Sequence, residues 1–315
     1  MTYRAMHDDS LMSAEAGKFL DEAPPLQHRP LCDTDMAQLR AEIRAGFTMG
    51  AERAIARHRV EVDRTQIAGT PCLEVRPSNS ATERTVLYCY GGGYVTGSPF
   101  EDLPVSAALA DHLKARVVAV DYRLAPEHPY PAAVEDGFAV FRALATSCSP
   151  GSWAIAGESA GGNLALALVQ RACSHGLSLP SAVALLSPWC DLSNAGDSIT
   201  ANAGRDPTLH PEFLGDAARA YAGARDRSDP DVSPLHGRFD AAFPPTIITS
   251  GTRDLLLSQC VRLARTMRGA GVPVELCIWD GLWHVFEFYD QLPEAHQSLA
   301  HVAGCLAQRL NGSAA

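Results

Sequence analysis

Apolar runs of strand length alternate with helix-like periodicity along most of this chain. Residues 59–63 and 72–76 alternate apolar and polar positions, as half-exposed strands do, whereas residues 85–89 are nearly all apolar, as in a buried strand. Because strands alternate with helices farther along, we expect an α/β fold with a mostly parallel central sheet and helices on both faces. The pattern predicts further strands at 116–120, 152–157, 182–187, 246–250 and 274–279, and helices at about 131–146, 160–173, 255–268 and 293–310.

Two segments depart from this alternation. Residues 1–50 begin polar and irregular and then show a short helical pattern at 35–43. Residues 192–231 are rich in Asp, Gly, Ala and Asn and contain one helical pattern at 211–221. We therefore expect a main domain over 51–315, an N-terminal cap segment over 1–50 and a cap insertion at about 192–231, with the two cap pieces covering the strand ends.

Composition and charge narrow the class of protein. The 315 residues are 46% hydrophobic, enough for a large core, and no apolar stretch approaches the ~18 residues of a membrane-spanning helix. A net charge of −10 would repel nucleic acids and anionic lipids, so we expect a neutral small-molecule ligand, no nucleic-acid partner and no stable membrane insertion. The acidic residues near the N-terminus are unlike a secretory signal, and we expect a cytoplasmic protein. A homodimer is left open.

The nine cysteines show no spacing typical of a disulfide framework or a zinc site. Their number is odd, they are scattered, and no Cys-x-x-Cys pair occurs. Most lie among apolar residues, as Cys89 and Cys277 do, where a thiol behaves as a small core side chain. We interpret them as structural.

A serine motif lies between a predicted strand and a predicted helix. It is Gly157-Glu158-Ser159-Ala160-Gly161. A tight strand-to-helix turn brings backbones so close that the positions two before and two after the serine must be almost without side chains, while the serine points outward. A glycine-rich turn without chemistry would give the same pattern, so the motif alone is weak. Its position between strand and helix favours Ser159 as a nucleophile.

A glycine run follows the apolar strand that ends at residue 89. Its sequence is Tyr90-Gly91-Gly92-Gly93-Tyr94. Consecutive glycines leave backbone N–H groups uncovered, as an oxyanion hole requires, and the predicted donors are the amides of Gly92, Gly93 and Ala160. A glycine hairpin or a phosphate loop is the alternative, but no Gly-Lys-Ser/Thr follows and the G-x-G-x-x-G pattern is incomplete.

A serine nucleophile also needs a base and an acid that orients the base. His284 lies in a loop just after the last predicted strand, whereas the other histidines lie on the last helix or in polar, irregular sequence. Asp254 follows the strand at 246–250 and opens a helix. Asp280 is the rival acid, but it lies so close to His284 along the chain that its carboxylate would reach the ring with difficulty. We therefore predict Ser159, Asp254 and His284 as the catalytic residues.

Several blocks between about residues 60 and 290 resemble the hormone-sensitive-lipase-like family of esterases, the bacterial branch of that α/β-hydrolase group. They occur in the order typical of that family. Beside the serine and glycine motifs they are Asp121-Tyr122-Arg123-Leu124-Ala125-Pro126-Glu127, Pro129-Tyr130-Pro131-Ala132-Ala133, Ser187-Pro188-Trp189-Cys190-Asp191-Leu192, Ser233-Pro234-Leu235, Phe243-Pro244-Pro245, Gly251-Thr252-Arg253-Asp254-Leu255-Leu256 and Ala270-Gly271-Val272-Pro273-Val274.

The resemblance implies an α/β-hydrolase fold with a small two-part cap and a Ser159, Asp254 and His284 triad. It also implies no metal and no organic cofactor. The expected activity is hydrolysis of short- to medium-chain carboxylic esters through an acyl-enzyme. A lactonase or an acyltransferase would use the same acyl-enzyme and stays open. A ligand receptor on the same fold would be expected to have lost a triad residue.

Two positions differ from the usual family pattern or vary within it. Tyr90 stands where the family usually has a histidine that braces the glycine loop, and a tyrosine hydroxyl could take over that hydrogen bond. Glu158 is given no catalytic role, but its carboxylate could hold neighbouring loops. Apolar residues near the motifs could line the substrate pocket or simply pack in the core: Tyr94, Phe100, Trp189, Phe213, Leu255 and Trp283.

Overall fold

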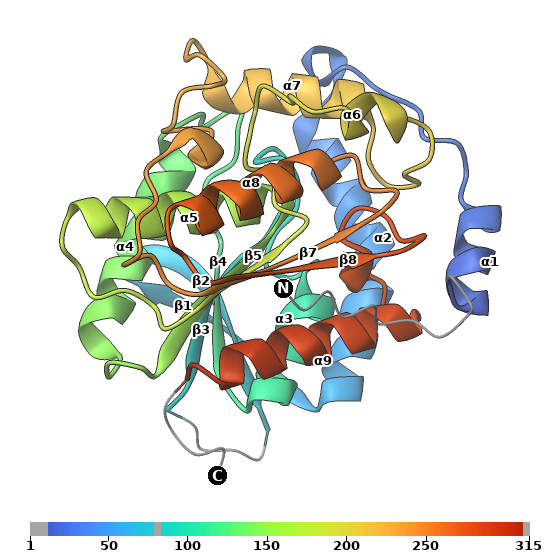
Figure 1. Ribbon diagram of the computed structural model, residues 1–315. Helices are drawn as coiled ribbons and strands as arrows, with labels where there is room; N and C mark the ends of the chain where they lie inside the picture. The colour runs from blue at the N-terminus through green and yellow to red at the C-terminus, as the bar shows by residue number, and fades with distance from the viewer. Residues whose placement is uncertain (1–11, 79–82, 311–315) are drawn as a thin grey trace.

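One eight-stranded sheet forms the centre of the described structure (Figure 1), a computed structural model that describes residues 12–78 and 83–310. The strand order is β1-β2-β4-β3-β5-β6-β7-β8. β2 runs antiparallel to β1 and β4, and all other neighbours are parallel. The strands are β1 (Val60–Ile67), β2 (Thr70–Pro77), β3 (Thr85–Cys89), β4 (Arg116–Val120), β5 (Trp153–Glu158), β6 (Val183–Leu186), β7 (Thr246–Gly251) and β8 (Val274–Trp279). The predicted α/β class with a mostly parallel sheet is confirmed.

The burial of the strands follows their sequence patterns. Every residue of β3 and β5 is buried, in agreement with their nearly continuous apolar character, whereas in β1 only Val60 is buried and the other residues are half-buried or exposed. β1 and β2 form a hairpin whose turn residues Ala68 and Gly69 both have positive φ (51° and 81°), as a type I′ turn requires.

Helices cover both faces of the sheet. α4 (Ala132–Ser147), α5 (Ser159–Ser174) and α8 (Leu257–Gly269) pack on one face, and α3 (Leu103–Leu113) and α9 (Pro293–Ala307) on the other (Figure 1). α2 (Met36–His58) packs on α3. The sequence pattern did not predict α3, whose almost fully buried surface has no polar stripe to mark its period. In the described part of the chain, no helix combines the length and apolar character needed to cross a bilayer.

The two expected cap pieces lie together at the edge of the sheet where the parallel strands end (Figure 1). The insertion contains α6 (Ser198–Ala201) and α7 (Pro211–Ala222), and the N-terminal segment contains α1 (Ala14–Glu22). The segments touch at α7, where Asp216 accepts a hydrogen bond from the N–H of Leu31 (3.0 Å) and pairs with His28 (3.2 Å). α2 continues across the expected boundary between residues 50 and 51.

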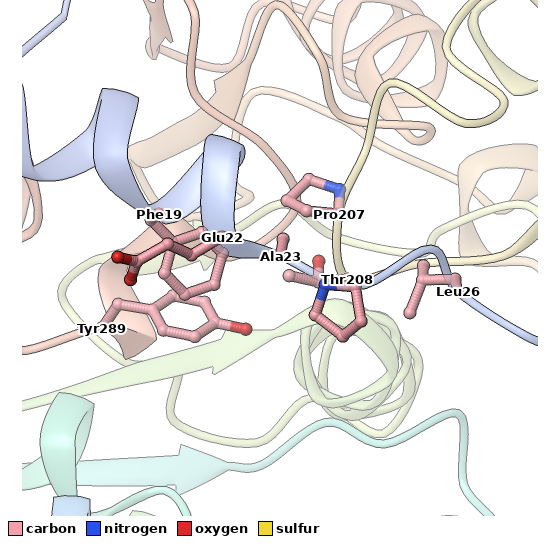
Figure 2. A pocket seen from close by; sticks show the side chains of 8 residues that line it. Phe19, Glu22, Ala23, Leu26, Pro207, Thr208 and Tyr289 are labelled. Carbon is pink, nitrogen blue, oxygen red and sulfur yellow. The ribbon is translucent and has the colours of Figure 1, made fainter.

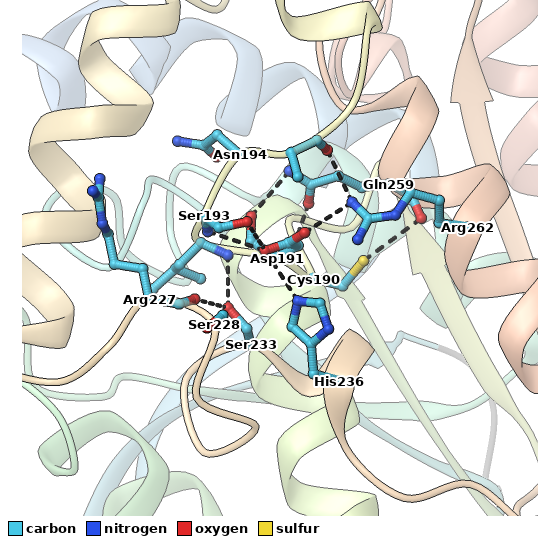
Figure 3. Close-up of polar contacts among 12 residues, drawn as sticks. Cys190, Asp191, Ser193, Asn194, Arg227, Ser228, Ser233, His236, Gln259 and Arg262 are labelled. Carbon is cyan, nitrogen blue, oxygen red and sulfur yellow. Dashed lines mark hydrogen bonds and ion pairs between the residues drawn. The ribbon is translucent and has the colours of Figure 1, made fainter.

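The base of the insertion is pinned by a buried aspartate (Figure 3). Asp191 Oδ2 pairs with Arg262 of α8 at 2.8 Å, and the amide side chain of Gln259 bonds both the N–H and the C=O of Asp191 (3.0 Å each). At the other end of the insertion, Ser233 Oγ accepts the N–H of Leu192 (2.7 Å). The two ends are therefore clasped to one another and to α8.

A second apolar cluster lies beneath α1. Its buried members include Trp279, Trp283 and Phe286 from the segment around His284. Phe19 of α1 stacks on Trp283 with ring centroids 4.5 Å apart and meets Tyr289 edge-on at 4.6 Å. The N-terminal helix thus covers the residue that precedes His284.

Candidate active site

The sheet register brings the predicted motifs to one place. β3 and β5 pair from Thr85↔Trp153 to Cys89↔Gly157, so the glycine run and the serine motif leave the sheet side by side. β7 and β8 pair up to Gly251↔Trp279, so the segments leading to Asp254 and His284 also emerge together.

Ser159 occupies a sharp turn between β5 and α5. Its φ is +50°, a strained value for a residue with a side chain, as in a nucleophile elbow. The flanking glycines are required by close backbone approach: a Cβ at Gly157 would fall 2.4 Å from the carbonyl oxygen of Gly161. A Cβ at Gly161 would fall 2.0 Å from that of Cys89. This packing is the physical reason for the G-x-S-x-G spacing.

The structure brings the three predicted catalytic side chains into hydrogen-bond contact. Ser159 Oγ lies 2.9 Å from His284 Nε2, and His284 Nδ1 lies 3.1 Å from Asp254 Oδ1. All three residues are buried. Asp280, the rival acid, instead accepts a hydrogen bond from Thr252 Oγ1 at 3.0 Å.

The electrostatics suit a base oriented by a carboxylate. Burial alone would raise the pKa of Asp254, but the imidazole of His284 and hydrogen bonds, including one from the N–H of Leu256 (2.8 Å), lower it below the ordinary value. Burial alone would lower the pKa of His284, but the charge and hydrogen bond of Asp254 raise it. Ser250 Oγ donates to the other oxygen of Asp254 at 2.8 Å.

Asp206 is a buried residue at this site that the sequence analysis missed. Its Oδ2 accepts the N–H of His284 (3.2 Å) and of Leu255 (3.4 Å). Its Oδ1 accepts the N–H and the hydroxyl of Thr208, both at 2.9 Å. Burial and the nearby charge of Asp254 raise its pKa to about 6. A residue of the cap insertion thus holds the backbone of the histidine loop.

The glycine run forms a loop beside Ser159. Gly92 and Gly93 have φ of +94° and +65°, and a Cβ at Gly92 would fall 2.3 Å from the carbonyl oxygen of Thr96. Within the described residues, the N–H groups of Gly92 and Gly93 have no hydrogen-bond acceptor. Ala160 lies in the first turn of α5, where N–H groups have no partner inside the helix. These are the three amides predicted as oxyanion donors.

Tyr90 braces the loop through a second tyrosine. Its ring stacks on that of Tyr122 with centroids 4.2 Å apart. The hydroxyl of Tyr90 donates to the backbone carbonyl oxygen of Tyr122 (3.3 Å), and the hydroxyl of Tyr122 donates to the backbone carbonyl oxygen of Tyr90 (2.7 Å). A reciprocal, buried tyrosine pair therefore braces the start of the glycine loop.

The side chain of Glu158 packs against the glycine loop at Gly91. A Cβ at Gly91 would fall 2.0 Å from Glu158 Oε1, so the carboxyl group lies directly against the glycine loop. Burial and the adjacent Asp102 raise the pKa of Glu158 well above its ordinary value. Tyr88 donates its hydroxyl hydrogen to Asp102 at 2.8 Å.

Of the six candidate pocket residues, two are half-buried and four are fully buried. Phe213 of α7 lies beside the glycine loop, where a Cβ at Gly93 would be 3.2 Å from its ring. Phe100 lies under the guanidinium of Arg44, 4.3 Å from its ring centroid. The other four are fully buried and pack in the core: Tyr94, Trp189, Leu255 and Trp283.

A cavity of about 440 Å³ opens between the cap pieces (Figure 2). Phe19 and Leu26 line it from the N-terminal side, and Pro207 and Thr208 from the insertion. The triad residues do not line it. Thr208 Oγ1 nevertheless lies 3.4 Å from the carbonyl oxygen of His284, so the cavity borders the histidine loop.

Two groups of side chains among the described residues could hold a metal ion, and neither includes a triad residue. One is His28, His210 and Glu212 in the cap, and the other is Glu275 of β8 with His301 and Cys305 of α9.

Known proteins place the chain in a family. Residues 86–288 match the family described as alpha/beta hydrolase fold. An acetyl-hydrolase of Streptomyces hygroscopicus is 38% identical over 76% of this chain and 79% of its own length, and an esterase of Acinetobacter venetianus is 34% identical over 78% and 81%.

Solved structures of esterases also resemble this chain. The esterase EstE5, in crystals soaked with ethyl alcohol, has a TM-score of 0.87 and 30% identity and covers 94% of this chain and 99% of its own. A hormone-sensitive lipase from a metagenome library has a TM-score of 0.84 and 33% identity, over 96% and 100%. The chain belongs to the α/β-hydrolase fold family and, within it, to the hormone-sensitive-lipase-like esterases.

Proposed function

We propose that this protein is a serine carboxylesterase that hydrolyses short- to medium-chain carboxylic esters at Ser159. One observation carries the proposal: the hydrogen-bonded row from Ser159 Oγ to His284 (2.9 Å) and on to Asp254 (3.1 Å). A hydroxyl, an imidazole and a carboxylate in this order are what acyl transfer by serine requires. The esterase names of the relatives support the same activity.

The proposed reaction uses these three side chains and the glycine loop. His284 Nε2 takes the proton of Ser159 as Oγ attacks the ester carbonyl, and the amides of Gly92, Gly93 and Ala160 hold the negative oxygen. His284 then gives this proton to the departing alkoxide as its bond to the carbonyl carbon breaks. Water, deprotonated by His284, attacks the acyl-enzyme, and the acid leaves as the proton returns to Ser159. Asp254 orients His284 throughout.

Short acyl groups are favoured by the surroundings of the glycine loop. The ring of Phe213 stands against Gly93, so the space beside the proposed oxyanion hole is limited. Relatives from Streptomyces hygroscopicus and Mycobacterium tuberculosis carry the names acetyl-hydrolase and putative acetyl-hydrolase. A lactonase or acyltransferase shares the acyl-enzyme and stays an alternative, which a panel of acyl-chain lengths and lactones would test.

Substitution of the nucleophile tests the proposal. Ser159→Ala should lower turnover of p-nitrophenyl acetate and butyrate by at least about a thousandfold, because the acyl-enzyme cannot form. Ser174→Ala, which changes an exposed serine at the end of α5, is the matched control and should leave turnover unchanged. A fluorophosphonate probe should label Ser159 in the unmodified protein, whereas a receptor would leave it unlabelled. Wild-type turnover by Ser159→Ala would refute the assignment.

The cytoplasmic location stays a prediction from the sequence, and the sequence leaves a homodimer open.

A further inference from the structure

Side chains from two elements far from the triad meet at the edge of the sheet. Glu275 and Cys277 point to the same face of β8, since alternate residues of a strand share a face. His301 and Cys305 lie one turn apart on α9 and so share one face of that helix. We call Glu275, His301 and Cys305 the α9–β8 cluster.

Three different donor atoms converge in this cluster. His301 Nε2 lies 2.7 Å from Glu275 Oε1, Cys305 Sγ lies 3.4 Å from Glu275 Oε2, and Cys305 Sγ lies 3.7 Å from His301 Nε2. Cys277 Sγ lies 3.7 Å from Glu275 Oε1 and holds this carboxylate from the strand side. A cavity of about 360 Å³, which Glu275 and Cys305 help to line, opens beside the cluster.

These separations are close to those around a tetrahedral zinc ion. Zinc bonds of roughly 2.3 Å to sulfur and roughly 2.0–2.2 Å to nitrogen and oxygen place the ligand atoms about 3.4–3.6 Å apart. The two sulfur distances in the cluster, 3.4 and 3.7 Å, already fit. His301 and Cys305 contact different oxygens of Glu275, so one of these oxygens must move to the ligand position, and its separation from His301 must exceed the present 2.7 Å. Rotation of the exposed Glu275 side chain allows both changes.

The donor types also select the ion. A thiolate and an imidazole favour zinc over calcium or magnesium, which prefer oxygen. One thiolate and one carboxylate would neutralise the two positive charges of the ion. The group in the cap is less suitable, because it has no thiol and because His210 Nδ1 already accepts the N–H of Glu212 (3.2 Å).

We propose that Glu275, His301 and Cys305 form a zinc-binding site that fastens α9 to the edge strand β8. The fourth position is left to water. The site departs from the sequence-based expectations of no metal and of purely structural cysteines, because its ligands have no motif spacing and meet only in the fold. Its role is structural, and it does not depend on the proposed esterase reaction.

Cobalt provides a direct readout. The full chain, kept reduced and freed of metal with a chelator, is titrated with Co²⁺ and then with Zn²⁺. We expect one equivalent of Co²⁺ to give a thiolate-to-cobalt charge-transfer band and the intense visible bands of a tetrahedral ion. Zn²⁺, which binds such sites more tightly, should abolish them. No thiolate band at several equivalents would overturn the proposal.

Variants locate the site. Cys305→Ser and His301→Gln should weaken cobalt binding by at least about 100-fold, since even outer-shell changes cost 10- to 100-fold. Cys173→Ser, at an exposed thiol, and His28→Gln, in the cap group, are the control variants and should bind cobalt as the unmodified protein does. A band that survives both cluster substitutions would overturn the proposal.

A measurement on the unmodified protein guards against misfolded variants. Alkylation by iodoacetamide is followed peptide by peptide in the presence and absence of one equivalent of Zn²⁺. Zinc should slow the reaction of Cys305 at least about tenfold, because a coordinated thiolate is withdrawn from attack, and should leave Cys173 unaffected. Equal rates at Cys305 with and without zinc would contradict the site.

Discussion

Phe19→Ala tests how firmly the N-terminal cap helix is attached to the histidine loop. The ring of Phe19 stacks on Trp283 at 4.5 Å and meets Tyr289 at 4.6 Å, and it also lines the cavity between the cap pieces. α1 is a nine-residue helix, too short to be stable without packing. Its docking therefore depends on few contacts, of which this ring is the largest.

The expected loss can be estimated from burial. Truncation of a fully buried Phe costs about 3–5 kcal/mol, and Phe19 is only half-buried, so we expect a loss of about 2–3 kcal/mol including both ring contacts. At about 1.4 kcal/mol per factor of ten, the undocked population of α1 should rise about 30- to 150-fold. The substitution leaves in place the hydrogen bonds from Ser13, the N-cap of α1, to Glu294.

Native-state proteolysis measures this population. Trypsin cleavage after the exposed Lys18, followed by intact mass, should accelerate by about that factor, and kcat/KM for short esters should fall as Trp283 loses its cover. Phe239→Ala removes another half-buried ring, paired with Phe243 at 5.2 Å outside the cap, and should leave Lys18 cleavage unchanged. If the folded Phe19→Ala protein were cleaved at the wild-type rate, the proposed anchoring of α1 would be wrong.

Three further predictions concern the reaction itself. Asp254 raises the pKa of His284 against the effect of burial, and only the neutral ring is a base. The value of kcat/KM should therefore rise with pH through a midpoint above about 6.5, and a flat profile from about pH 5 to about pH 9 would contradict this prediction. Asp206→Asn replaces one acceptor oxygen with an NH2 donor, although both oxygens of Asp206 face donors, from His284 and Leu255 on one side and from Thr208 on the other. The substitution should lower kcat about tenfold or more with a smaller change in KM in steady-state kinetics, and an unchanged kcat would remove Asp206 from the positioning of the loop. Phe213→Ala should shift the preference among p-nitrophenyl esters from acetate toward longer acyl chains, whereas an unchanged chain-length profile would place this ring outside the acyl site.

Much of the sheet could be predicted because its strands carry their own pattern. The strand predicted at 85–89 coincides with β3, and those at 116–120 and 274–279 with β4 and β8. The serine and glycine motifs could be recognised for a related reason. Backbone contacts within about 3 Å permit only glycine at Gly157 and Gly161, so the sequence itself shows this constraint.

The missed features depend on contacts between distant segments. α1 is helical in a region that reads as polar and irregular, and it is held by Trp283 rather than by its own composition. Asp206 lies in a loop rich in Asp and Gly, where nothing local distinguishes it from its neighbours. Only the fold shows that its carboxylate accepts the N–H of His284. The α9–β8 cluster joins residues from a strand and a helix in the same way.

The clasp around Asp191 makes the cap insertion a candidate for exchange as a cassette. Because its two ends are tied to each other and to α8, the intervening chain could be replaced by that of a relative while the sheet and its register stay intact. Asp206 limits which segments can be exchanged, because the replacement segment must also provide a hydrogen-bond acceptor for the N–H of His284. Substrate range could then be varied by exchange of whole cap insertions, provided that each new insertion keeps a carboxylate in the place of Asp206 to hold the catalytic base His284.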